Sequence, residues 1–137
     1  MTATEKAKPT TRGDRLRKSV MGPEPICWPA LPPDKEQAVN AEMADWVAWL
    51  TRRYDLDRRT IPECWGKHGA LVEELSALRS SWQLAFSRTA PKDAPLTWHS
   101  GFAQARARLA DWAARAGCRP GRHQESGEAG EALRGTR

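Results

Sequence analysis

Apolar residues recur every three or four positions in three stretches of this chain, the spacing of helices with one buried face. The first stretch predicts a helix from about residue 34 to 53, with Asp34 as its N-cap. Its predicted buried residues are Val39, Met43, Trp46, Val47 and Leu50. The second stretch predicts a helix from about residue 71 to 86, with an apolar stripe that runs from Leu71 to Phe86.

The third stretch predicts a helix from about residue 95 to 116 that ends at Gly117, a suitable left-handed C-cap. Its apolar residues alternate at intervals of four and three, as in a coiled-coil seam: Trp98, Phe102, Ala105, Leu109, Trp112 and Ala116. The opposite face carries small side chains that would let a partner helix approach closely: Ala103, Ala107, Ala110 and Ala114. Because alanine is also the best helix former, this pattern has a purely local explanation as well.

A short helix is predicted between the first two. Thr60 and Glu63 have the spacing of a capping box, and Gly66 and Gly69 are expected to end the helix near residue 68. No alternating run of β-branched residues indicates a strand. The predicted fold is therefore all-α, a compact bundle of three main helices plus a short helix at about 61–68.

The two ends of the chain hold few apolar residues. Residues 1–20 contain one Leu and one Val besides Met1, residues 21–33 hold five prolines, and residues 119–137 hold a single Leu. Such segments bury too little apolar surface to offset their ordering entropy. We therefore predict a disordered basic arm and Pro-rich linker at 1–33, one helical bundle at 34–118 and a disordered tail at 119–137.

The formal net charge of +5 is concentrated near the N-terminus. Residues 34–118 are nearly balanced, whereas residues 1–20, the N-terminal arm, carry only two acidic residues against six basic ones. These six are Lys6, Lys8, Arg12, Arg15, Arg17 and Lys18. An arm of this kind attracts phosphates by counterion release, so it is a candidate nucleic-acid-binding segment. The other interpretation is a solubilising tail.

Two Cys/His pairs are candidate metal ligands: Cys64 with His68, and Cys118 with His123. Two cysteines and two histidines form a common tetrahedral zinc site. The pairs can meet only if the last helix returns its C-terminus to residues 64–68. A separation beyond roughly 8 Å between Cys64 and Cys118 would exclude zinc, whose bonds to sulfur are ~2.3 Å long. Alternatively, Cys64 is a small buried residue that hydrogen-bonds to His68, or the pair forms a cysteine nucleophile.

Other chemistry has little support in the sequence. It contains no glycine-rich phosphate loop, no nucleotide or flavin motif and no paired-carboxylate site, so we expect no enzyme and no cofactor apart from this candidate zinc. The three cysteines lack the spacing of a disulfide framework, and no apolar run exceeds about five residues. We therefore expect no membrane segment and predict that the protein is located in the reducing cytoplasm.

The segment from Trp65 to His99 resembles small domains of unknown function in proteins of actinobacterial plasmids, integrative elements and phages. The likeness rests on Trp65 and His68 in "CWGKH", on "LVEELSALRSSW", on "TWH" and on Gly117-Cys118. No catalytic activity attaches to this family, and the resemblance implies an accessory protein of a mobile genetic element.

Together these observations predict a non-enzymatic helical adaptor that acts by binding another protein or a second copy of itself. One alternative is an accessory nucleic-acid-binding protein that uses its N-terminal arm. Another is a small domain that binds a structural zinc ion, and such an ion is compatible with either of the other two roles.

Overall fold

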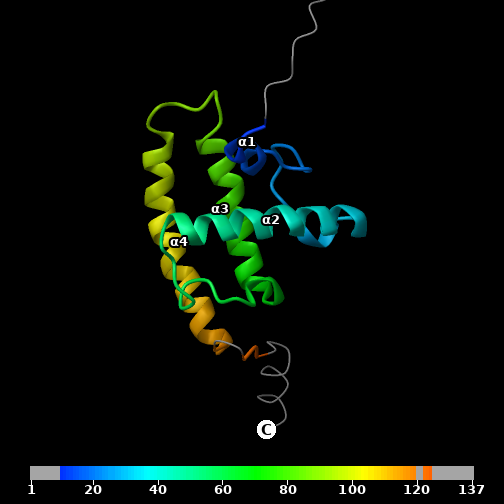
Figure 1. The fold of residues 1–137 in the computed structure, drawn as a ribbon, viewed down its shortest axis with the longest axis vertical. Coiled ribbons are helices and arrows are strands. Elements are labelled where there is room, and N and C mark those ends of the chain that lie inside the picture. Colours follow the sequence, from blue (N-terminus) through cyan, green and yellow to red (C-terminus); the bar gives the residue numbers. More distant parts are fainter. Residues whose placement is uncertain (1–9, 120–121, 125–137) are drawn as a thin grey trace, which may run out of the picture.

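Helices form almost all of the regular structure in the computed structural model, which describes residues 10–119 and 122–124 (Figure 1). Its α-helices in these ranges are α1 (Arg12–Arg17), α2 (Pro33–Arg53), α3 (Gly69–Ala85) and α4 (Ala94–Ala116). No strand forms there beyond an isolated bridge between Arg119 and Arg122. The predicted all-α bundle with three main helices is confirmed. None of the described helices combines the length and apolar character needed to cross a bilayer.

The arrangement of the helices sets the position of every candidate site. α3 and α4 lie side by side as an antiparallel hairpin, and α2 crosses α3 (Figure 1). The chain reverses between Phe86 and Asp93, so the end of α4 lies beside the beginning of α3. Residues just before α3 and just after α4 therefore meet, although about 50 residues separate them in sequence.

Large aromatic side chains form the centre of the core. Trp46 is fully buried, and Trp82 and Trp98 are each only 5% exposed. Trp98 stacks on Phe102 with ring centroids 5.0 Å apart, and its indole N–H donates a hydrogen bond to Ser81 Oγ at 3.0 Å. The core interpretation of these three tryptophans is confirmed, since each buries a large apolar area on a helix face that the sequence pattern marked.

Trp112 was predicted to be buried and is not: it is 39% exposed, and the Arg115 guanidinium lies over its ring. Ala113 is buried in its place. A straight α-helix has 3.6 residues per turn and drifts by about 20° per heptad from a strict 3.5-residue repeat. At about 100° per residue, positions 112 and 113 then lie about equally far on either side of the centre of the buried stripe, so the helical repeat alone does not decide between them and tertiary packing does.

Two predicted helix starts are also wrong. Pro32, not Asp34, is the N-cap of α2. Asp34 lies in the first turn, where its negative charge interacts favourably with the positive end of the helix dipole. The capping box at Thr60 does not form, and only a single 3₁₀ turn, η2 (Trp65–Lys67), is present. The Glu63 carboxylate pairs with Arg58 at 2.7 Å, so it is not available to cap Thr60.

Residues 10–33 are ordered, contrary to the prediction of a disordered segment at 1–33. Leu16 of α1 is buried, and polar side chains of α3 bind the main chain of this region. The Arg79 guanidinium, fully buried, donates to Lys18 O and to a Glu42 carboxylate oxygen, each at 3.0 Å. In the Pro-rich linker, the Trp28 indole N–H donates to Ser76 Oγ at 3.0 Å. The disorder predicted for residues 1–9, 120–121 and 125–137 falls outside the described residues.

The different burial of Trp98 and Trp112 can be tested with two tryptophan substitutions. Trp98→Ala should lower the free energy of unfolding by about 3–5 kcal/mol, because it leaves a cavity in the aromatic core. Trp112→Ala should cost no more than about 1 kcal/mol, since much of that ring is in water. Urea denaturation followed by circular dichroism measures both. Equal losses would show that Trp112 is part of the core.

The buried Arg79 gives a second prediction. Glu42→Ala leaves the Arg79 guanidinium without its carboxylate, and we expect a loss of about 2 kcal/mol in the free energy of unfolding. The control is Glu73→Ala, an exposed glutamate on α3, for which a change within about 0.5 kcal/mol is expected. Indistinguishable urea midpoints for the two variants would contradict this role of Glu42.

Candidate metal centre

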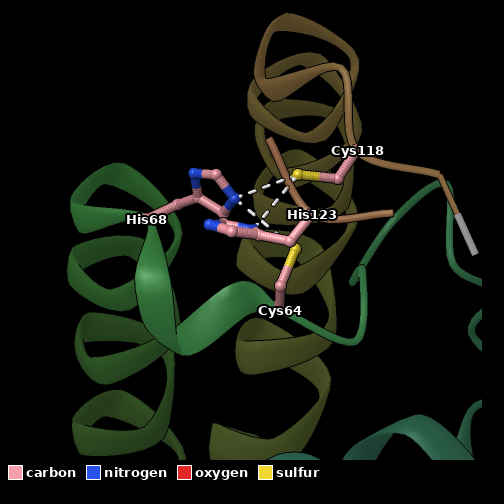
Figure 2. A group of neighbouring side chains, drawn as sticks. All are labelled: Cys64, His68, Cys118 and His123. Atoms are coloured by element: carbon pink, nitrogen blue, oxygen red, sulfur yellow. Dashed lines mark hydrogen bonds between the residues drawn. The ribbon is translucent and has the colours of Figure 1, made fainter. Parts of the chain in front are cut away.

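The antiparallel α3/α4 hairpin brings the two Cys/His pairs together. Cys64 and His68 flank η2, at the entrance to α3, and Cys118 follows the C-cap of α4. Figure 2 shows all four side chains pointing toward one another, His123 included. We refer to Cys64, His68, Cys118 and His123 as the Cys/His group.

The distances within the Cys/His group match a tetrahedral zinc site. His68 Nε2 lies 3.5 Å from Cys64 Sγ and 3.2 Å from Cys118 Sγ, and Cys118 Sγ lies 3.6 Å from His123 Nδ1. All four ligand atoms are within 4.8 Å of one another, well inside the limit of roughly 8 Å set above. With Zn–S bonds of ~2.3 Å and Zn–N bonds of ~2.1 Å, a tetrahedron has S···N edges of about 3.6 Å.

Burial makes the group a defined site and not a chance surface cluster. His68 is only 4% exposed, and the other three residues are partly buried. Within residues 10–119 and 122–124, no second group of three or more such residues is close enough to hold a metal. Cys27, the remaining cysteine, is exposed and is not a member of the group.

Backbone hydrogen bonds position Cys118 and His123. Arg119 and Arg122 exchange two of them, at 2.9 and 2.8 Å, so the chain returns and His123 lies beside Cys118. The Gln124 backbone N–H then donates to Cys118 Sγ at 3.2 Å, a contact that favours the thiolate form of a metal ligand. The sequence analysis missed this contribution of Gln124, although the Pro-Gly dipeptide at 120–121 is a turn signal.

Gly117 suits the end of α4 because of its backbone conformation. Its φ of +70° lies in the left-handed region that residues with a side chain rarely adopt. Glycine therefore lets the chain leave the helix at this point, which supports the geometry at Cys118.

The surroundings of Cys64 do not favour a cysteine nucleophile. Burial raises the pKa of the Cys64 thiol, and the neighbouring Cys118 thiol raises this pKa further. A catalytic cysteine needs the opposite shift, toward the thiolate at neutral pH. A bound dication supplies the positive charge that two adjacent thiolates require, so the residues of the Cys/His group fit a metal better than a thiol–imidazole catalyst.

The basic residues of the N-terminal arm are not arranged as one free patch. Arg12, Arg15 and Lys18 are exposed, but Arg17 pairs with Asp14 at 2.7 Å and donates to the Phe86 carbonyl oxygen. Lys6 and Lys8 lie outside the described residues. Nucleic-acid binding by this arm stays a prediction.

The alanine face of α4 is available to solvent. Ala103, Ala107 and Ala114 are exposed and Ala110 is half-buried, as expected for helix positions opposite the core. Ala110 and Ala114 line a groove that α4 shares with α2, whereas Ala103 and Ala107 do not. The partner surface predicted from these four alanines stays a prediction, and only the half with Ala110 and Ala114 lies along the groove.

Comparisons with protein-family models, with curated proteins and with solved structures each found no match. The resemblance to domains of plasmids, integrative elements and phages therefore stays a prediction.

The burial of the three cysteines predicts their reactivity. In the native protein, a maleimide should modify Cys27 rapidly and Cys64 and Cys118 much more slowly, because the latter two are partly buried within the Cys/His group. Mass spectrometry should show one rapid addition, and three in denaturant with chelator. The control variant Cys27→Ser should show no rapid addition. Rapid modification of all three native cysteines would contradict the geometry.

Proposed function

We propose that this chain is a non-enzymatic helical adaptor domain in which the Cys/His group holds a structural zinc ion. The observation that carries the proposal is the convergence of two sulfur and two nitrogen donors within 4.8 Å, from the segment that precedes α3 and the segment that follows α4. A set of two thiolates and two imidazoles in a tetrahedron is typical of zinc.

The number of protein donors supports a structural role for the metal. Catalytic zinc sites keep one coordination position open for water or substrate, whereas structural sites fill all four with protein ligands. Here Cys64, His68, Cys118 and His123 fill all four. The zinc would act as a cross-link between the start of α3 and the residues after α4.

The fold does not depend on this cross-link alone. The aromatic core around Trp46, Trp82 and Trp98 is formed by α2, α3 and α4 and contains none of the four ligands. We therefore expect the metal-free protein to retain its helices and to lose stability, unlike zinc fingers, which unfold without metal.

Protein binding is the cellular role that we propose for the domain, as an accessory protein of a mobile genetic element. The exposed alanine face of α4 and the implied genetic setting support it. Zinc thiolates and the exposed Cys27 thiol both fit a reducing cytoplasm. Binding of nucleic acid through the N-terminal arm is less favoured, because Arg17 is engaged in contacts within the domain.

Elemental analysis tests the metal directly. Protein purified from zinc-sufficient cells should contain about one zinc per chain. Cys118→Ser should lose most of it, and the matched control Cys27→Ser should keep it. Cobalt reconstitution should produce the visible bands of tetrahedral Co²⁺ in the control and not in Cys118→Ser. Less than one zinc per several chains, together with no cobalt bands, would overturn the proposal.

Removal of the metal should destabilise the domain without unfolding it. A strong chelator should lower the melting temperature by about 10 °C or more, since a cross-link worth at least ~2–3 kcal/mol shifts a domain of this size by several degrees per kcal/mol. Helical circular dichroism at 25 °C should persist. A melting curve that chelator leaves unchanged would contradict a stabilising metal.

A further inference from the structure

A groove of about 1250 Å³ runs beside the Cys/His group. Three segments form its apolar lining: α2, the connection between α2 and α3, and the C-terminal half of α4. The apolar residues include Val47 and Ala48, then Ile61 and Trp65, and finally Ala110 and Ala114. We call this site the arginine groove, because four arginines also line it: Arg52, Arg58, Arg59 and Arg119.

Most of these arginines lack a carboxylate partner. Arg58 pairs with Glu63 at 2.7 Å, whereas no ion pair within the described part of the chain includes Arg52, Arg59 or Arg119. The one other acidic residue that lines the groove is Asp57, and its carboxylate accepts a hydrogen bond from the Arg59 backbone N–H. The groove thus combines an apolar lining with three guanidinium groups that form no ion pair with the described residues.

We propose that the arginine groove binds a segment of a partner protein that presents apolar side chains flanked by Asp or Glu. This inference rests on the proposed adaptor function and names the chemistry of its partner. Apolar side chains would fill the space along Ala110 and Ala114, and flanking carboxylates would form charge-assisted pairs with the arginines. Trp and Arg, the types found here as Trp65 and Arg59, dominate the energetics of many protein interfaces.

Nucleic acid fits the arginine groove less well. Phosphates are contacted by exposed basic and polar groups, and this groove is lined largely by aliphatic side chains. A second, smaller groove between α3 and α4 offers no comparable charge signal, because Arg108 there is paired with Glu74.

The arginine groove and the metal centre are adjacent but separable. Gly117, Cys118 and Arg119 line one end of the groove, so a metal bound to Cys118 would also fix the position of Arg119. Arg52 and Arg59 belong to other segments and are not ligands. Substitutions at these two positions therefore test the groove while leaving the metal ligands intact.

Selection from a phage-displayed library of random peptides on the intact purified protein tests the proposal. Recovered peptides should be enriched in Asp and Glu next to apolar residues. Their affinity, measured by fluorescence anisotropy, should fall at least about tenfold for the variant Arg52→Glu/Arg59→Glu and for Ala114→Trp. The matched controls Lys35→Glu/Lys92→Glu and Ala107→Trp, exposed positions outside the groove, should bind within about twofold of the parent.

Three results would overturn the proposal. One is recovery of no specific peptide. Another is recovery of peptides that lack an acidic bias, or that bind the Ala114→Trp and Ala107→Trp variants with equal affinity. The third is salt-dependent binding of a labelled DNA duplex that the Arg52→Glu/Arg59→Glu variant abolishes, which would assign the groove to nucleic acid. Zinc content is measured on every variant. If the purified protein binds acidic peptides but contains no zinc, the proposed metal site is overturned and the proposed binding by the arginine groove is not.

Discussion

Packing of α4 along α3 is the constraint on which the rest of the structure depends. The hydrogen bonds from the Trp98 indole N–H to Leu78 O and Ser81 Oγ, together with the buried Leu109, fix the two helices in register. This register places the residues before α3 beside those after α4. Both the Cys/His group and one end of the arginine groove are consequences of that single antiparallel contact.

The domain combines two kinds of stabilisation at different places. Apolar and aromatic burial in the bundle is distributed over many contacts, each of them small. With the proposed zinc bound, the Cys/His group would concentrate its contribution at four side chains, where the hydrogen bond from the Gln124 N–H supports one sulfur. This division would suit the adaptor that we propose, because the packed core carries the arginine groove and the zinc would hold the residues after α4 that line it.

Arg79 shows how a segment with few apolar residues becomes part of a fold. It is fully buried, and its guanidinium binds a carbonyl of the N-terminal region and the carboxylate of Glu42. Both hydrogen bonds come from Nη2, and Nε and Nη1 are buried without a hydrogen-bond partner among the described residues. A buried charge is costly, so the guanidinium depends on Glu42 and on the chain that passes at Lys18. The attachment is thus specified by hydrogen bonds as much as by the burial of Leu16.

The sequence alone determined the helices and the identity of the four candidate ligands. Helical periodicity is a local property, so α2, α3 and α4 and the left-handed Gly117 could be predicted from neighbouring residues. Only the tertiary structure decided which residues meet. It selected Ala113 over Trp112, because the two positions lie about equally far from the centre of the buried stripe of α4 and the helical repeat does not decide between them. It also ordered α1 through Arg79 and closed the distance between the two Cys/His pairs. These outcomes depend on contacts between residues far apart in the chain, and no local spacing encodes such distances.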